Sequence, residues 1–142
     1  MKTVKQLLAG KSPGVVSIGP EASVFEALQL MADKNVGAVV VLNGQKLVGI
    51  FTERDYARKV ILMGRSSKEI SVEEIMTHKV LCVSPAQTVD ECMEIMTQKR
   101  CRHLPVVDEK RVIGIISIGD LVKEVISEQQ ETIHQLESYI MS

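Results

Sequence analysis

The apolar residues in the first half of the chain switch between two spacings. Short β-branched runs predict strands, and apolar residues three and four positions apart after Ser23, a good helix N-cap, predict a helix. Gly19-Pro20 ends the first run, and Asn43-Gly44 predicts a two-residue hairpin turn. The predicted elements are a strand at 15–18, a helix at 23–31, strands at 39–42 and 47–51, and a helix at about 53–63.

The second half of the chain repeats this plan. A shift of sixty-five positions lays residues 16–61 on 81–126 without a gap, which indicates an internal duplication. Each copy ends in the same motif, GIFTERD at 49–55 and GIISIGD at 114–120. The second copy is predicted to have strands near 80–83, at 103–107 and at 112–116, with helices from Thr88 and from Ser117.

Two short leading helices and a polar tail complete the organisation. Capping-box patterns at Thr3 and Ser71 predict a small helix before each repeat. In the tail, Ile133, Leu136 and Ile140 share one helix face, which we expect to pack on the domain or on the same helix of a second subunit. The expected boundaries are 1–63 for repeat 1 with its leading helix, 64–70 for the linker, 71–126 for repeat 2 and 127–142 for a C-terminal amphipathic helix.

The composition is that of an ordinary globular protein, with 45% hydrophobic residues in 142 and a formal net charge of −1. Near-neutral charge gives no reason to expect binding to nucleic acid or to an anionic membrane. No apolar run approaches the roughly 20 residues of a membrane-spanning helix. The first residues resemble neither a secretory signal nor a transit peptide, so we expect a cytoplasmic protein.

The cysteines and histidines predict no metal site. Cys82, Cys92 and Cys101 form no C-x-x-C pair, and the three histidines are scattered without a metal-binding spacing. We expect each cysteine to be a small core residue, and a redox role for one of them stays an open alternative.

The duplicated motif places a hydroxyl and a carboxylate three residues apart at the start of a helix. Thr52 and Asp55, and likewise Ser117 and Asp120, form a helix-capping arrangement. The same geometry suits a ribonucleotide, because a helix start binds phosphate and an acid one turn later can accept both ribose hydroxyls. The glycine before each hydroxyl would leave room for a base against the strand. The two interpretations are compatible, and both stay open.

A duplicated strand-helix-strand-strand-helix unit with Gly-x-x-Thr/Ser-x-x-Asp at each end resembles a pair of cystathionine-β-synthase (CBS) domains, a Bateman module of the stand-alone type. The resemblance runs from about Val4 to Ile126 and includes both motifs intact. It implies an α+β (mixed α/β) fold in which two repeats, related by a pseudo-twofold axis, pack sheet to sheet. It also implies two clefts for an adenosine ligand (AMP, ADP, ATP, NAD(H) or S-adenosylmethionine), with no metal required.

The resemblance implies particular residues for each cleft. Each aspartate would hold a ribose and each hydroxyl a phosphate, aided by Arg54 in the first cleft. Gly119 stands where the second repeat would carry the equivalent of Arg54, so the second cleft lacks that cation. The residues expected at cleft 1 are Thr52, Arg54, Asp55, Ile50 and Val80. Those expected at cleft 2 are Ser117, Gly119, Asp120, Ile115 and Val16. Residues that could serve either cleft are Arg102, His103, Gly37 and Ala38.

The sequence contains no recognisable catalytic constellation and no P-loop, so we do not expect an enzyme. The leading hypothesis is an adenine-nucleotide sensor that signals to an unidentified partner protein. The alternative is a constitutive interaction module, for example with a thioredoxin-type partner as the plant members of the family suggest, in which the motifs are only helix caps. The amphipathic tail and the habit of CBS pairs predict a homodimer.

Overall fold

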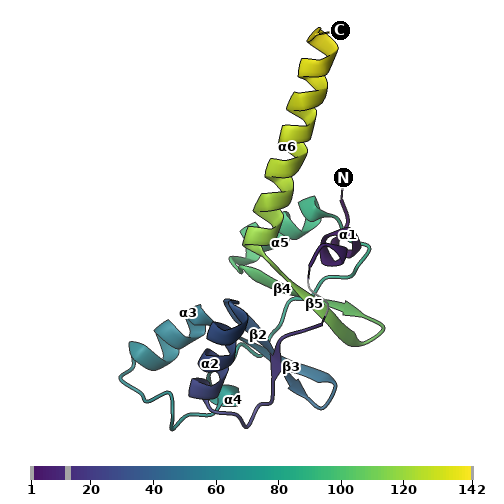
Figure 1. The fold of residues 1–142 in the computed structure, drawn as a ribbon. Coiled ribbons are helices and arrows are strands. Elements are labelled where there is room, and N and C mark those ends of the chain that lie inside the picture. Colours follow the sequence, from purple (N-terminus) through teal and green to yellow (C-terminus); the bar gives the residue numbers. More distant parts are fainter. Residues whose placement is uncertain (1, 12–13, 142) are drawn as a thin grey trace.

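Two halves of like construction make up the computed structural model, which describes residues 2–11 and 14–141 (Figure 1). The elements in chain order are α1 (Val4–Ala9), β1 (Ser17–Ile18), α2 (Val24–Lys34), β2 (Ala38–Asn43), β3 (Lys46–Thr52), α3 (Glu53–Tyr56), the π-helical turn η1 (Ala57–Ile61), α4 (Val72–Ile75), α5 (Val89–Lys99), β4 (His103–Asp108), β5 (Arg111–Ser117) and α6 (Ile118–Met141). The predicted α+β fold of two repeats and a C-terminal helix is confirmed.

The sheets of the two repeats differ at their first strand. Repeat 1 has the order β1-β2-β3, with β1 parallel and β3 antiparallel to β2. Repeat 2 has only the antiparallel pair β4-β5. The strand predicted near 80–83 is reduced to one parallel bridge between Val83 and Val106, because Val80 and Leu81 leave the sheet edge and line a cleft instead. The hairpin turn of repeat 1 is Gly44-Gln45, one residue later than predicted, with Gly44 at φ 66°.

Each repeat buries its own apolar core. In repeat 1 the helix α2 packs on the sheet through side chains such as Val24 and Phe51, both fully buried. In repeat 2 the helix α5 and the start of α6 cover β4 and β5 through Cys92, Leu104 and Leu121. The helix caps predicted at Ser23 and Thr88 are present, each hydroxyl accepting a backbone N–H three residues later.

The leading helices are exchanged between the repeats. Val4 of α1 lies in the core of repeat 2, and its N–H donates to the Gln87 carbonyl at 2.8 Å. Val72 of α4 lies in the core of repeat 1, and its N–H donates to the Ala22 carbonyl at 2.8 Å. Both valines are fully buried, which contributes about 1.5–3 kcal/mol each. The exchange ties the two repeats into one unit.

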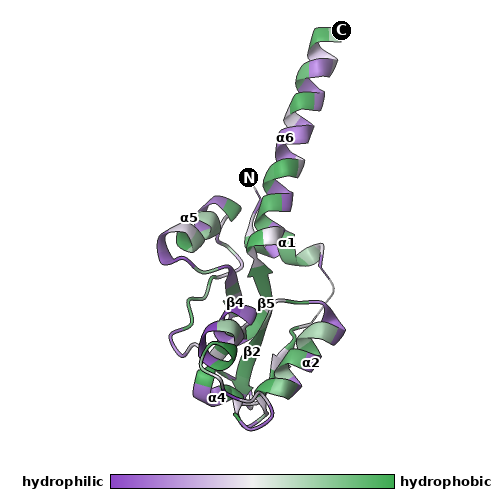
Figure 2. Cartoon of the chain, turned by 90° about the vertical axis from the view of Figure 1, so that its left-hand side faces the viewer, coloured by the Kyte–Doolittle hydropathy of each residue, from purple (hydrophilic) through white to green (hydrophobic). Residues whose placement is uncertain are grey.

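The tail is not a separate element. It continues α6 without a break, and the helix stands away from the rest of the molecule (Figure 1). Every residue from 131 to 141 is exposed, so the first of the two alternatives, packing on its own domain, is wrong, and packing on a second subunit stays a prediction. Apolar and polar residues occupy different faces of this helix (Figure 2). Its apolar face is therefore free to meet another chain.

Candidate functional site

Two clefts lie between the repeats, and segments of both repeats wall each one. Cleft 1, of about 820 Å³, is bounded by the start of α3 and by residues within 77–81 and 99–103. Cleft 2, of about 1100 Å³, is bounded by residues 14–17 and 34–38 and by the junction of β5 with α6. A ligand in either cleft would contact both repeats.

The structure brings most of the predicted residues to these clefts. Cleft 1 contains all five residues predicted for it, namely Thr52, Arg54, Asp55, Ile50 and Val80. Cleft 2 contains four of its five, namely Ser117, Asp120, Ile115 and Val16. Of the residues predicted for either cleft, Arg102 lines cleft 1, Ala38 lines cleft 2, and Gly37 and His103 line both.

Gly119 is the predicted residue that does not line a cleft. It occupies the first turn of α6, at the position that Arg54 occupies in the first turn of α3. An arginine there reaches the cleft through its long side chain, and a glycine has no side chain with which to do so. The structure therefore does not bring Gly119 to the lining of cleft 2.

Several cationic residues line the clefts that the sequence analysis did not assign to them, among them Lys11 and Lys34 in cleft 2 and Lys99 and Arg100 in cleft 1. A signal was available for one pair, because the duplication aligns Lys34 with Lys99. No such signal marks Lys11. The chain between α1 and β1 carries it to the other repeat, and the apolar pattern does not fix that path.

Asp55 is a buried carboxylate, with a side chain only 10% exposed in the wall of cleft 1. Its Oδ2 accepts the N–H of Thr52 at 3.1 Å, and the Thr52 hydroxyl accepts the N–H of Asp55 at 3.2 Å, which completes a capping box. Its Oδ1 accepts the Thr77 hydroxyl at 3.2 Å and pairs with the Lys59 ammonium at 3.1 Å. Both carboxylate oxygens are thus held in place by protein groups in the wall of the cleft.

Asp120 repeats this arrangement in cleft 2 with a different lysine. Its Oδ2 accepts the N–H of Ser117 at 2.8 Å, and the Ser117 hydroxyl accepts the N–H of Asp120 at 3.1 Å. The Lys11 ammonium donates to the same Oδ2 and to the Ile115 carbonyl, each at 2.8 Å. Partial burial raises the pKa of Asp120, but the bonds from Lys11 and Ser117 outweigh it and hold the pKa below its ordinary 3.8.

The glycine of each motif is needed for packing between segments. A Cβ on Gly49 would lie 2.8 Å from Cγ of Met76 and 3.0 Å from the Thr77 carbonyl oxygen. A Cβ on Gly114 would lie 2.6 Å from Cδ2 of Leu8. Met76 and Leu8 belong to the exchanged leading segments. The space beside these glycines is therefore filled by protein, and the expected room for a base at that point is absent.

His103 lies where the two clefts meet, since it lines both. A Cβ at Gly37 would lie 3.5 Å from its Nε2, an ordinary van der Waals distance, so the imidazole lies directly beside the backbone of Gly37. Burial lowers the pKa of His103 from 6.5 and outweighs the opposite effect of the nearby Asp120 and Glu53 carboxylates. The side chain is therefore a neutral hydrogen-bonding group at neutral pH.

The cysteines do not form an activated thiol site. Cys92 is buried in the core as expected, but Cys82 is exposed and Cys101 is half-buried at cleft 1. Burial raises the pKa of all three thiols above the ordinary 9.0, which disfavours the thiolate. Within residues 2–11 and 14–141, no group of three His, Cys, Asp or Glu side chains could hold a metal ion, and no helix is long and apolar enough to span a membrane.

The model of one family, the CBS domain, matches residues 4–61 and 72–127. The chain belongs to the CBS-domain family. It matches twice, so the protein is a tandem CBS pair, and the two clefts described above lie between its two CBS repeats.

Known CBS proteins resemble the chain along most of its length. It is 46% identical over 123 residues to the mitochondrial CBS domain-containing protein CBSX3 of Arabidopsis thaliana, covering 83% of this chain and 60% of that protein. A putative signal-transduction protein with CBS domains from Burkholderia ambifaria has a similar structure, with a TM-score of 0.87 and 52% identity over 90% of this chain and 96% of that one.

A second related structure contains ligands. The CBS domain pair of protein MJ0100 was solved in complex with 5′-methylthioadenosine and S-adenosyl-L-methionine. It superposes with a TM-score of 0.80 and 26% identity, covering 90% of this chain and 98% of that one. Adenosine-containing molecules are therefore ligands of a CBS pair with this fold.

Proposed function

We propose that the protein is a non-catalytic regulatory module that binds adenosine-containing ligands in its two clefts and signals their presence to a partner protein. The observation that carries the proposal is the pair of capped helix starts, each of which presents a carboxylate at the wall of a cleft between the repeats. The two ligands of the MJ0100 pair support the same class of molecule.

The candidate ligands are AMP, ADP, ATP, NAD(H) and S-adenosylmethionine. Their ribose hydroxyls would donate to Asp55 or Asp120 and replace the lysine ammonium that each aspartate holds in this structure. A 5′ phosphate would meet the hydroxyl of Thr52 or Ser117 at the helix start. No step of this binding requires a metal.

Ligand binding would change the population of conformations rather than catalyse a reaction. Because each cleft is walled by both repeats, a bound ligand favours the arrangement in which the two walls are correctly spaced. The regulated partner would recognise that arrangement. We further propose that the active unit is a homodimer, in which the free apolar face of α6 meets its copy.

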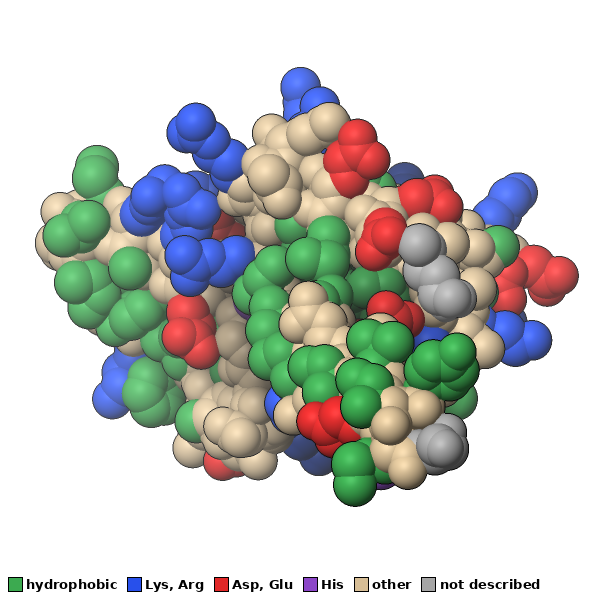
Figure 3. Space-filling model, turned by 90° about the horizontal axis from the view of Figure 1, so that it is seen from above, with side chains coloured by type: hydrophobic (Ala, Val, Ile, Leu, Met, Phe, Trp, Pro, Cys, Tyr) green, Lys and Arg blue, Asp and Glu red, His purple; other side chains and the backbone are tan. Residues whose placement is uncertain are grey.

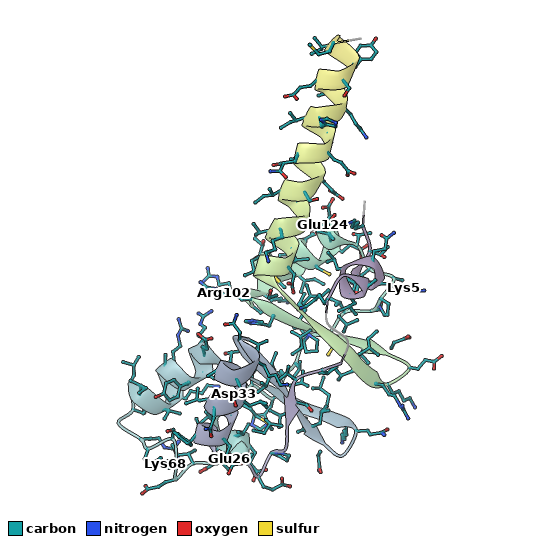
Figure 4. All side chains as sticks on the ribbon, in the orientation of Figure 1. Lys5, Glu26, Asp33, Lys68, Arg102 and Glu124 are labelled. Atoms are coloured by element: carbon teal, nitrogen blue, oxygen red, sulfur yellow. The ribbon has the colours of Figure 1, made fainter. Side chains whose placement is uncertain are left out.

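A thermal-unfolding screen with the candidate ligands tests the proposal. A ligand at about 100 times its Kd stabilises the folded state by about 2.7 kcal/mol, and the midpoint of unfolding rises accordingly. The double variant Asp55→Asn/Asp120→Asn should lose that rise, because the amide replaces one acceptor oxygen of each carboxylate with an NH₂ group that cannot accept a ribose hydroxyl proton. Asp33→Asn, on the exposed surface of α2, is the matched control (Figure 4). No rise with any ligand would contradict ligand binding.

A constitutive interaction module is the second candidate. Both motifs form complete helix caps from the chain's own hydroxyl and carboxylate groups, and this observation favours it. Affinity capture of partners with and without the stabilising ligand separates the two functions. A sensor should capture a partner to different extents in the two conditions, whereas identical capture would favour the constitutive module.

A further inference from the structure

The two clefts differ sharply in their free positive charge. Cleft 1 is lined by seven cationic side chains, namely Arg54, Arg58, Lys59, Lys79, Lys99, Arg100 and Arg102. Only Lys59 forms an ion pair within the described part of the chain, with Asp55. The other six have no carboxylate within ion-pair distance among the described residues.

Cleft 2 offers far less positive charge to a ligand. Two lysines line it, Lys11 and Lys34. The Lys11 ammonium is already neutralised by Asp120 at 2.8 Å. Lys34 is then the one cation at cleft 2, among the residues described, that has no ion-pair partner.

The duplication places this difference at equivalent positions of the two repeats. At four pairs of positions sixty-five residues apart, a cation that lines cleft 1 in one repeat corresponds to a neutral residue in the other repeat. The pairs are Arg54 with Gly119, Lys79 with Gly14, Arg100 with Asn35, and Arg102 with Gly37. The difference thus arises from side chains at matched sites, while the capping geometry of the two aspartates is the same.

The cations of cleft 1 come from both repeats and meet across it. The Arg54 guanidinium of repeat 1 donates to the Arg100 carbonyl of repeat 2 at 3.4 Å. Arg102 extends from the upper half of the molecule on the side where α3 lies (Figure 4), and Lys and Arg side chains gather on that side (Figure 3). A guanidinium group without an ion-pair partner can bind two oxygens of one phosphate through two N–H groups. Several such groups together attract a polyanion strongly.

We propose that the two clefts select ligands by the charge of the 5′ group. Cleft 1 takes an adenosine di- or triphosphate, whose phosphate chain the unpaired cations neutralise. Cleft 2 takes an adenosine ligand whose 5′ group carries little or no negative charge. This inference rests on the proposed function, since it assigns a ligand class to each of the two clefts.

Calorimetric titration with ATP and with 5′-methylthioadenosine tests the division. Arg54→Gln/Arg102→Gln should weaken ATP binding by about 10- to 100-fold, because hydrogen bonds to charged groups are lost, and should change 5′-methylthioadenosine binding little. Asp120→Asn should weaken 5′-methylthioadenosine binding more than ATP binding, and Asp55→Asn should do the reverse. Lys110→Gln, in the β4–β5 turn outside both clefts, controls for the loss of a surface charge.

The outcomes separate this inference from the proposed function. Suppose that both ligands bind, but Arg54→Gln/Arg102→Gln weakens both equally, or Asp55→Asn mainly weakens 5′-methylthioadenosine binding and Asp120→Asn mainly weakens ATP binding. Either result would overturn the charge selection and leave the proposed sensor function standing. No binding of either ligand would contradict both. ATP affinity should also fall as salt is raised while 5′-methylthioadenosine affinity changes little, since exposed charges are screened. An equal salt dependence for both ligands would count against the selection.

Discussion

At the scale of single residues, each motif aspartate has a structural and a ligand-facing part. One carboxylate oxygen caps the helix, and the same carboxylate holds a lysine at the wall of a cleft. The spacing of hydroxyl and acid was enough to predict the cap, and the resemblance to CBS pairs implied that each carboxylate lies at a cleft. The lysine partners could not be predicted, because Lys11 reaches Asp120 from 109 positions away in the chain.

Lys11 is expected to compete with the ligand of cleft 2. Its ion pair is partly exposed, so such a pair stabilises by about 0.2–1 kcal/mol. Lys11→Met should therefore tighten the binding of 5′-methylthioadenosine by about two- to fivefold in calorimetric titration. Lys5→Met, an exposed lysine on α1, should leave the affinity unchanged. Weaker binding after Lys11→Met would show that the ammonium contacts the ligand instead of competing with it.

His103 makes a separate, pH-dependent contribution at this scale. Its pKa in the folded protein lies below the ordinary 6.5, so the unfolded chain takes up a proton more readily as the pH falls through that value. The free energy of unfolding should therefore decrease between about pH 7.5 and pH 5.5. Urea unfolding at both values should show a smaller decrease for His103→Gln than for the wild type, and His134→Gln on exposed α6 is the control. An equal decrease in His103→Gln and the wild type would refute the assignment.

At the scale of elements, local signals predicted the helices well and the sheet edges less well. The caps at Ser23 and Thr88 and the capping boxes at Thr3 and Ser71 are present where the sequence placed them. The strand near 80–83 was predicted from its apolar residues, yet two of them, Val80 and Leu81, line a cleft and do not pair with a neighbouring strand. The exchange of α1 and α4 left no sequence signal, because an apolar face shows that a helix is buried but not against which repeat.

Because the exchanged leading segments pack against the motif glycines, replacing such a glycine with a larger residue should lower the free energy of unfolding. An added methyl group at Gly49 would meet Met76 and the backbone oxygen of Thr77, and such overpacking costs about 1–3 kcal/mol. Gly49→Ala should lower the free energy of unfolding by that amount in urea titration. At Gly10 the nearest atom to an added Cβ is 3.6 Å away, so Gly10→Ala should change stability little. Equal stability of the two variants would argue against the close contact.

At the scale of the whole molecule, the duplication was sufficient to predict two repeats, and the resemblance to CBS pairs implied the two pseudo-equivalent clefts between them. The continuity of α6 was harder to predict, since the sequence pattern of the tail is that of a separate amphipathic helix. In the structure it extends a helix whose free apolar residues recur at heptad spacing, from Val122 and Ile126 to Ile133, Leu136 and Ile140. A stripe of this kind is typical of a two-helix seam.

The apolar stripe on α6 predicts a dimer in which two copies of this helix pack together in a seam. Light scattering should give twice the chain mass for the wild type, and Ile133→Glu/Leu136→Glu should give a monomer, because two charges would be buried in the seam. Gln135→Glu/Ser138→Glu adds the same charge on the other side of the helix and should stay dimeric. A monomeric wild type, or a dimer that survives both apolar substitutions, would refute the seam.

The central claim for the whole molecule is that the motif aspartates hold the ribose of an adenosine ligand between the two repeats. A crystal structure of the protein grown with ATP and 5′-methylthioadenosine tests it most directly. We predict ribose hydroxyls within about 2.5–3.0 Å of the carboxylate of Asp55 or Asp120, with the lysine ammonium displaced. A ligand bound outside both clefts, or a ribose that touches neither aspartate, would contradict the account.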